Sequence, residues 1–232
     1  MLKLKNVFSG YGKSLVLQGL DLEVDTGEAV ALLGRNGVGK TTTLRTIMGL
    51  TPSKSGEITF EGHNINNQPP HTVPRQGIGY VPQGRHIFPN LSVMDNLCIG
   101  LRSAPTQAQL IPVFARFPRL EERSQQLGGT LSGGEQQMLA IARCLIMGPK
   151  ILLLDEPTEG IMPKLVAGLR DEIKAINETG VSVLFVEQNI RAALAVCSRV
   201  YIMEKGIVSY EGTAGELKRN PEIVKKHLGV SL

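Results

Sequence analysis

The chain lacks several features that would indicate a membrane span or a secreted protein. Among its 232 residues there is no tryptophan, no low-complexity tract and no obvious internal repeat. No run of about 18 apolar residues is present, so no segment is expected to cross a membrane. The first five residues lack the apolar core of a signal peptide.

Charge of one sign is also not in large excess. Lys and Arg exceed Asp and Glu by 25 − 21 = 4, and this balance is too mild to indicate nucleic acid. A mildly basic protein is equally compatible with the anionic face of a membrane.

Cysteine and histidine are too sparse and scattered for a metal site built from these residues. Three cysteines without C-x-x-C spacing stand among apolar neighbours and are expected to be reduced core thiols, as in cytosolic proteins: Cys98, Cys144 and Cys197. Three histidines without companions at metal-ligand spacing are expected at the surface: His63, His71 and His227.

Hydrophobic periodicity predicts an α/β chain. The predicted strands are residues 2–8, 20–24, 28–33, 57–60, 78–81, 151–154, 181–186, 200–203 and 207–210. The predicted helices are residues 43–50, 132–147, 163–179, 190–196, 214–220 and 221–228, and residues 52–56 are predicted as a turn. Strands that alternate with helices imply a mainly parallel core sheet covered on both faces, and the first strands are expected to form an antiparallel side sheet.

Residues 91–127 interrupt this order because they contain no strand pattern. Ser92 resembles the N-cap of a helix at residues 93–101, and residues 112–120 have helical apolar spacing. We therefore predict a single domain over residues 1–232, with a helical subdomain at about 85–147 inserted in the core. A chain of 232 residues is long enough for one such α/β domain.

A glycine-rich turn separates the apolar run 29–33 from the helix-forming run 42–48. Its residues fit the pattern G-x-x-x-x-G-K-[ST]: Gly34, Arg35, Asn36, Gly37, Val38, Gly39, Lys40, Thr41 and Thr42. Glycines allow successive N–H groups to point at one anion, and the helix N-terminus adds positive charge. Lys40 is predicted to reach the β- and γ-phosphates of a nucleotide and Thr41 to hold Mg²⁺. An accidental glycine-rich turn would not explain the Lys-Thr pair.

Two carboxylates follow the apolar run 151–154. Ligands of open α/β sheets bind at the carboxyl ends of the strands, so Asp155 is predicted to hold Mg²⁺ together with Thr41. Glu156 is predicted to act as the general base that polarises an attacking water. Taken alone, these acids would equally suit a helix cap, but the phosphate-binding turn favours the catalytic interpretation.

A second anion-binding turn begins at Ser132. Ser132, Gly133 and Gly134 open a helix whose first N–H groups are exposed. Two such turns in one chain suggest that one subunit's turn closes over the phosphate-binding turn of another. The alternative is an ordinary N-capped helix.

Together these segments resemble the motifs of ATP-binding-cassette (ABC) ATPases. Residues 34–42 resemble Walker A, Gln83 the Q-loop, residues 131–137 the signature and residues 151–157 Walker B. The resemblance covers essentially the whole chain and implies a P-loop NTPase of the ABC type. It also implies ATP and Mg²⁺ as cofactors and a head-to-tail dimer with a second ABC ATPase subunit, which sandwiches ATP.

The resemblance implies further site residues. Tyr11 would stack on adenine, and Gln83 would touch Mg²⁺ or the attacking water and sense the membrane partner. The residues expected to bind the γ-phosphate region in trans are Ser132, Gly133, Gly134 and Gln136.

Two positions depart from the family pattern. The position where the family usually has its switch histidine is occupied by Gln188. Glutamine can hydrogen-bond a phosphate or orient water but cannot carry a proton as histidine can. The position where the family usually has its D-loop aspartate is occupied by Met162, which cannot make the usual polar contacts across a dimer. Because Glu156 is present, we still expect hydrolysis, with Gln188 as the phosphate-sensing residue.

Other segments resemble one branch of the family, the second ATPase of bacterial branched-chain amino acid importers and its relatives that import urea and short amides. Residues 80–85, 131–143 and 186–189 carry this likeness, and residues 68–71 and 158–163 are more similar to the urea branch. The likeness implies a peripheral protein at the cytoplasmic face of the cell membrane. Its expected partners are two separate permease subunits and, indirectly, a periplasmic or extracellular solute-binding protein. The permease is expected to dock at residues 86–89, although core packing would also explain their apolar character.

Two alternative functions are open at this point. An ABC-type ATPase that acts on nucleic acid or the ribosome would need a long coiled coil or two cassettes, and neither fits in 232 residues. A weakly hydrolysing nucleotide-gated scaffold would explain Gln188 and Met162. No nucleic-acid partner is expected, and both a homodimer and a heterodimer are compatible with the motifs.

Overall fold

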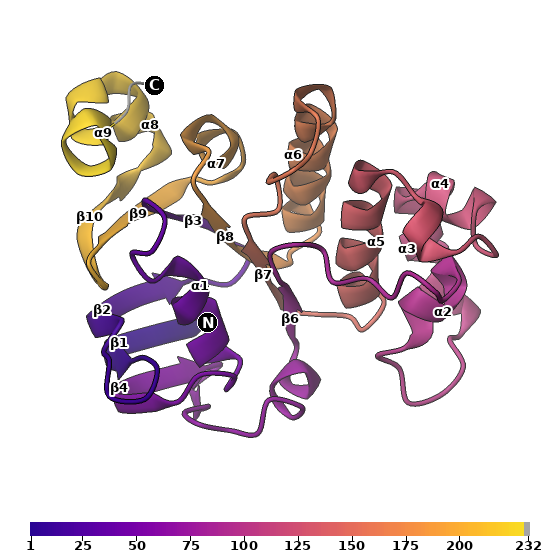
Figure 1. Ribbon diagram of the computed structural model, residues 1–232, viewed down its shortest axis with the longest axis horizontal. Helices are drawn as coiled ribbons and strands as arrows, with labels where there is room; N and C mark the ends of the chain where they lie inside the picture. Colours follow the sequence, from indigo (N-terminus) through magenta and orange to yellow (C-terminus); the bar gives the residue numbers. More distant parts are fainter. Residues whose placement is uncertain (230–232) are drawn as a thin grey trace.

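The computed structural model describes residues 1–229, which form two β-sheets with helices packed around them (Figure 1). The four-stranded sheet is antiparallel and has the order β2-β1-β4-β5: β1 (Leu2–Ser9), β2 (Leu17–Val24), β4 (Ser53–Phe60) and β5 (His63–Asn64). The six-stranded sheet has the order β10-β9-β3-β8-β7-β6: β3 (Ala29–Leu33), β6 (Ile78–Val81), β7 (Ile151–Asp155), β8 (Ser182–Glu187), β9 (Arg199–Glu204) and β10 (Ile207–Thr213).

Five neighbouring strands of the larger sheet, from β9 to β6, run parallel, and β10 adds an antiparallel edge. The carboxyl ends of parallel strands lie at one edge of a sheet. Leu33, Val81, Asp155 and Glu187, which end β3, β6, β7 and β8, therefore lie along the same edge. These strand ends and the segments that follow them contain the predicted site residues apart from Tyr11, which follows β1.

The helices and 3-10 turns of the described residues are α1 (Lys40–Ile47), η1 (Val73–Gln76), α2 (Val93–Cys98), α3 (Gln107–Arg116), α4 (Pro118–Glu122), η2 (Gly128–Thr130), α5 (Gly133–Leu145), α6 (Pro163–Glu178), α7 (Ile190–Val196), α8 (Ala214–Arg219) and α9 (Pro221–Leu228). Helix α1 packs on one face of the larger sheet and α5, α6 and α7 on the other, while α2 to α4 lie beyond α5 (Figure 1). Helices α2 to α5 lie together between β6 and β7 in the chain. No helix within residues 1–229 is long and apolar enough to cross a bilayer.

Strand β3 separates two hydrophobic cores because its side chains alternate between the faces of the sheet. Ala31 and Leu33 belong to the core that includes residues of α5, α6 and α7. Val30 and Leu32 belong to the other core, with residues of α1 and the antiparallel sheet.

Several element predictions were wrong at their ends; for example, β2 begins at Leu17 rather than at residue 20, and α2 ends at Cys98 rather than at residue 101. Helix α1 begins at Lys40 rather than at residue 43, directly after the left-handed Gly39 (φ 117°). Strand β4 begins at Ser53, inside the predicted turn 52–56, because its ladder with β1 extends to Ser9 and outweighs the local turn signal. The predicted helix at residues 112–120 is two helices, since α3 ends at Arg116 and Pro118 begins α4.

The cysteine and histidine predictions were partly correct. The three cysteines are free thiols, of which Cys197 is buried and the other two are half-buried. His63 and His71 are exposed, as expected. His227 was wrongly placed at the surface, because its Nδ1 lies 2.6 Å from Oε1 of Glu204 and packs α9 against the end of β9.

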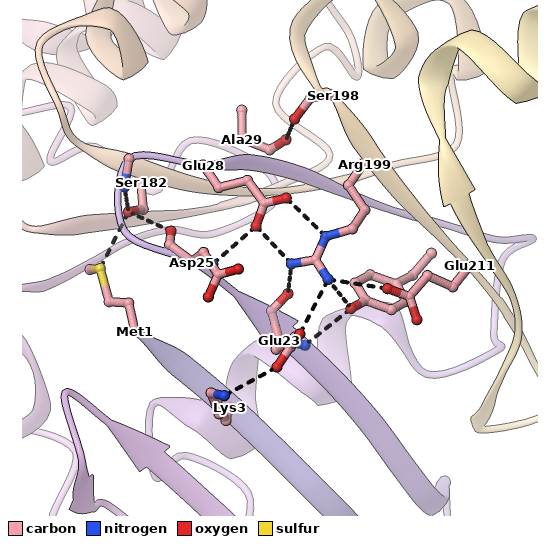
Figure 2. Close-up of polar contacts among 12 residues, drawn as sticks. Met1, Lys3, Glu23, Asp25, Glu28, Ala29, Ser182, Ser198, Arg199 and Glu211 are labelled. Atoms are coloured by element: carbon pink, nitrogen blue, oxygen red, sulfur yellow. Dashed lines mark hydrogen bonds and ion pairs between the residues drawn. The ribbon is translucent and has the colours of Figure 1, made fainter.

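Arg199 joins the two sheets at the edge opposite the predicted site (Figure 2). Its Nε and Nη2 donate to the two carboxylate oxygens of Glu28 at 2.8 and 2.7 Å. Nη2 also donates to the backbone oxygen of Glu23 in β2 at 3.1 Å, and Nη1 lies 3.1 Å from a carboxylate oxygen of Glu211 in β10. A planar guanidinium with several donors suits such a junction, and we assign it a structural role.

Candidate active site

The phosphate-binding turn connects β3 to α1, as the sequence predicts. Gly37 (φ 80°) and Gly39 (φ 117°) adopt left-handed backbone conformations that favour glycine. A Cβ atom at Gly39 would lie 2.8 Å from Cε of Met203, so a larger residue would also clash with β9. No side chain caps the N-terminus of α1, which leaves its first N–H groups available to an anion. Arg35 and Asn36 are exposed at the mouth of this turn.

Lys40 lies inside the turn and faces Glu156. Its Nζ donates to the carbonyl oxygens of Gly34 at 2.8 Å and Arg35 at 3.2 Å. The same atom lies 3.1 Å from Oε1 of Glu156, and the two side chains are only 4% and 11% exposed. The structure therefore brings the predicted phosphate ligand and the predicted general base together.

Asp155 and Thr41 also lie side by side. The Thr41 hydroxyl donates to Oδ1 of Asp155 at 3.1 Å, and the Tyr80 hydroxyl donates to Oδ2 at 3.3 Å. Asp155 is 1% exposed, and this burial raises the pKa of its carboxyl group although both hydrogen bonds act in the opposite direction. Burial and the adjacent Asp155 raise the pKa of Tyr80 as well.

These donors fit a magnesium ion. Hydroxyl and carboxylate oxygens are the ligands that Mg²⁺ prefers, and it commonly takes only one or two from the protein and the rest from phosphates and water. No cluster of three or more metal-binding His, Cys, Asp or Glu side chains occurs in the described part of the chain. A buried carboxylate whose anion is disfavoured by its surroundings gains from a divalent cation.

Gln83 lines the same cavity as Thr41 and Asp155, which has a volume of about 820 Å³. Its Nε2, however, donates to Oε2 of Glu159 at 2.7 Å. The amide group is therefore bonded to the loop after Glu156, a contact that the sequence analysis did not predict.

Glu156 itself has an unusual backbone conformation. Its φ of 45° is left-handed, which is uncommon for a residue with a side chain, and such strain is concentrated at functional sites. The backbone N–H of Glu156 donates to the carbonyl oxygen of Val186 at 2.9 Å and ties the residue to β8.

Glu187, which was not among the predicted site residues, holds the loop that contains Gln188. Glu187 is 2% exposed, and one of its oxygens accepts hydrogen bonds from the N–H and hydroxyl of Thr158 at 3.0 and 2.7 Å. The other accepts from the N–H groups of Gln188 and Asn189, both at 3.1 Å. Burial raises its pKa, and these four bonds oppose the shift. A glutamate that ends an otherwise apolar strand is the signal that would have indicated this role.

The ring of Tyr11 is accessible, and the second anion-binding turn lies apart from Lys40. Tyr11 is 51% exposed in the turn after β1, so its ring is accessible. Ser132 is exposed, and its N–H and Oγ donate to Oε2 of Glu135 at 2.9 and 2.7 Å. Ser132 and Gly134 line a separate cavity of about 440 Å³. The turn therefore does not belong to the Lys40 cavity within one chain.

Gln136 does not present a free amide group. Its Oε1 accepts from Nη1 of Arg85 at 3.2 Å, and its Nε2 donates to the carbonyl oxygen of Leu131 at 3.1 Å. Both ends of this side chain are engaged within the chain, so direct contact with a phosphate would require these bonds to break.

Comparison with known proteins agrees with this geometry. The family model described as ABC transporter matches residues 17–159. The chain is 41% identical to the high-affinity branched-chain amino acid transport ATP-binding protein BraG of Pseudomonas aeruginosa over 99% of this chain and 100% of BraG. It is 36% identical to the lipopolysaccharide export system ATP-binding protein LptB of Escherichia coli K12, over 97% of this chain and 95% of LptB. The chain belongs to the ABC transporter family and is an ABC transporter ATPase, with a cassette that binds ATP or ADP.

The fold prediction is confirmed by the same comparison. A dimeric structure of the ATP-binding cassette MJ0796, described as a post-hydrolysis state bound to ADP and phosphate, superposes with a TM-score of 0.80. It is 28% identical and covers 92% of this chain and 99% of the MJ0796 chain. The mainly parallel core sheet with an antiparallel side sheet is thus the fold of an ABC cassette.

Proposed function

We propose that this ATPase subunit powers the uptake of a small polar solute, either branched-chain amino acids or urea and short amides, through separate permease subunits. The relationship to BraG supports the importer assignment. The observation that carries the catalytic assignment is the pair of contacts Lys40–Glu156 and Thr41–Asp155, each 3.1 Å, at the carboxyl end of one parallel sheet. The urea branch is supported only by residues 68–71 and 158–163.

Residues of the phosphate-binding turn would bind and orient the nucleotide. The N–H groups that open α1 face the phosphates, and Tyr11 offers its ring to adenine. Lys40 exchanges its contact with Glu156 for the β- and γ-phosphates, and this exchange frees the Glu156 carboxylate.

Glu156 then takes a proton from the attacking water at its freed oxygen. Gln188 orients that water or donates to the γ-phosphate, held in place by Glu187. Thr41, Asp155 and Gln83 would hold Mg²⁺, which neutralises the phosphate charge when it is bound. For Gln83 to take part, its hydrogen bond to Glu159 must open.

The Ser132–Gly134 turn would complete the site of a second ABC ATPase subunit. It lies outside the Lys40 cavity of its own chain, and the related cassette MJ0796 is described as a dimer. A sandwich of two subunits, identical or different, uses both anion-binding turns.

The cavity that holds Gln83 would also be the docking site for the permease. Its lining includes four exposed apolar side chains: Leu50, Phe88, Ile99 and Met147. Within the described residues the buried Nε of Arg45, in the same lining, has no hydrogen-bond acceptor. A cytoplasmic helix of the permease with an apolar face and a carboxylate would fit this surface. Residues 85–147 would then act as the helical subdomain that transmits its movement, with the protein at the cytoplasmic face of the membrane.

Reconstitution in proteoliposomes with a co-purified permease and solute-binding protein tests the proposal. We expect hydrolysis to be stimulated by the transported solute, and parallel uptake of labelled leucine and labelled urea identifies the class of solute. Lipid-linked solute export by the same complex would replace the importer assignment. Hydrolysis that no solute changes, with salt-dependent binding of DNA or RNA, would favour the nucleic-acid alternative.

A further inference from the structure

Arg85 connects three segments of the chain that are far apart in sequence. Its Nη2 donates to the carbonyl oxygen of Gly160 at 2.9 Å, in the loop after Glu156. Its Nη1 donates to Oε1 of Gln136 at 3.2 Å, in the first turns of α5. Arg85 itself lies two residues after Gln83 and is half-buried. One guanidinium thus bridges the Q-loop, the helix that begins at Ser132, and the loop of Gly160.

Two glycines allow the guanidinium to approach this closely. A Cβ atom at Gly133 would lie 3.0 Å from both Nη atoms of Arg85, and one at Gly160 would lie 3.3 Å from Nη2. The guanidinium therefore packs against the backbone of the turn at Ser132–Gly134. A side chain at Gly133 would push the two apart.

The backbone around Arg85 is held in an unusual conformation. Gly84, Arg85 and His86 have φ values of 82°, 69° and 48°, all in the left-handed region. Residues other than glycine keep such a conformation only where the surroundings fix it. The bonds from Arg85 to Gly160 and from Gln83 to Glu159 attach this strained segment to residues 159–160.

We propose that Arg85 is a positioning residue that sets the distance between the Ser132–Gly134 turn and the Gly160 loop, and thereby controls closure of the ATP-bound dimer. A guanidinium donates along fixed directions in one plane, so it holds its two acceptors in a fixed relative position. A movement of Gln83 and Arg85 is therefore passed to the N-terminus of α5. This inference rests on the proposed dimer function, because that N-terminus is the part expected to reach the partner's nucleotide.

The test separates nucleotide binding within one chain from dimer closure. In a Glu156→Gln background, binding of a fluorescent ATP analogue is measured at low protein concentration, and ATP-driven dimerisation is measured by analytical ultracentrifugation. For Arg85→Ala we expect nucleotide binding within about twofold of the parent and dimerisation weakened at least about tenfold, which corresponds to ~1.4 kcal/mol. Arg85→Lys keeps the charge without the fork and should be weakened to an intermediate degree.

Arg102→Ala is the matched control, because Arg102 is exposed in the same region and forms no side-chain hydrogen bond or ion pair within residues 1–229. It should dimerise like the parent. If Arg85→Ala unfolds at the assay temperature, Arg85→Lys decides the question. If the folded Arg85 variants dimerise as well as Arg102→Ala does, the role of Arg85 is overturned, while the proposed dimer function stands. A Glu156→Gln parent that binds ATP but forms no dimer would instead overturn the proposed dimer function, and this inference with it.

Discussion

At the scale of single residues, the contact between Lys40 and Glu156 is the basis of the proposal that hydrolysis depends on the bound nucleotide. The two side chains neutralise each other 3.1 Å apart in a nearly water-free position. In the proposed mechanism, an incoming phosphate would compete for Lys40 and release the carboxylate, so the proposed base would become available only when the substrate is present.

Glu156→Gln tests this assignment. An amide cannot accept the proton of the attacking water, so we expect turnover to fall by about 10²–10⁴-fold while ATP binding is retained. Single-turnover hydrolysis and size-exclusion chromatography with ATP measure the two effects. Unchanged turnover would remove Glu156 from the role of base.

Asp155 illustrates a conflict between function and stability. Its pKa is higher in the folded chain than the ordinary value of 3.8, so the folded state binds the proton more tightly than the unfolded state does. Folding stability from this group therefore decreases as the pH rises through the window above 3.8.

Asp155→Asn should thus stabilise the nucleotide-free protein at neutral pH by about 0.5–2 kcal/mol and abolish Mg²⁺-dependent hydrolysis. The difference from the wild type should vanish near pH 3 to 4 and grow as the pH increases. Urea unfolding at several pH values checks this prediction. A variant that is less stable at every pH would show that the hydrogen bonds of Asp155 outweigh its burial.

Gln188 is predicted to sense the phosphate, and this role can be tested by substitution. Glu187 fixes its backbone, and its side chain is exposed at the end of β8. Gln188→Ala should lower turnover by about tenfold because one hydrogen bond to the phosphate or to water is lost, equivalent to ~1.4 kcal/mol. Gln188→His is the matched replacement and should retain more activity. Wild-type turnover in Gln188→Ala would exclude the phosphate-sensing role.

At the scale of elements, sequence predicts what depends on neighbours in the chain. The phosphate-binding turn is predictable because its glycines, Lys40 and the flanking strand and helix are contiguous in the chain. The start of β4 and the contacts of Glu187 were missed because they depend on β1 and on Thr158, which lie far away in the sequence. The role of Arg85 cannot be predicted from residues 80–85 alone, since its two acceptors, Gln136 and Gly160, meet it only after β6 and β7 pair.

Helix α5 offers an element-scale test with an internal control. Ser132 and Glu135 form a capping box, and Thr213 and Glu216 form the same arrangement at α8. Ser132→Ala and Thr213→Ala should each lower the free energy of unfolding by about 1 kcal/mol. Only Ser132→Ala should also weaken ATP-driven dimerisation. If both variants dimerise equally well, the Ser132 turn only caps α5 and has no role in dimerisation.

At the scale of the whole molecule, the cavity beside Gln83 joins nucleotide chemistry to the proposed docking surface. Its lining includes Thr41 and Asp155 as well as the apolar Phe88 and Ile99. A partner seated on the apolar part would therefore act directly on the segment that follows β6.

Ile99→Ser removes apolar surface from the docking part without touching the phosphate-binding turn. In the reconstituted transporter, solute-stimulated hydrolysis should fall at least about tenfold more than basal hydrolysis of the isolated subunit, a difference of ~1.4 kcal/mol in coupling. If stimulated and basal hydrolysis fall by the same factor, Ile99 contributes to the stability of the subunit rather than to docking.

Strand β3, whose alternate side chains enter the two cores, has a consequence for how the molecule melts. Val30 and Ala31 are neighbours in the chain but are buried on opposite faces, and β7, β8 and β9 divide their residues in the same way. Both cores therefore depend on the same strands, and we expect the loss of packing in one core to disrupt the sheet that supports the other. Calorimetry of the nucleotide-free subunit should therefore show one cooperative transition, with calorimetric and van't Hoff enthalpies that agree.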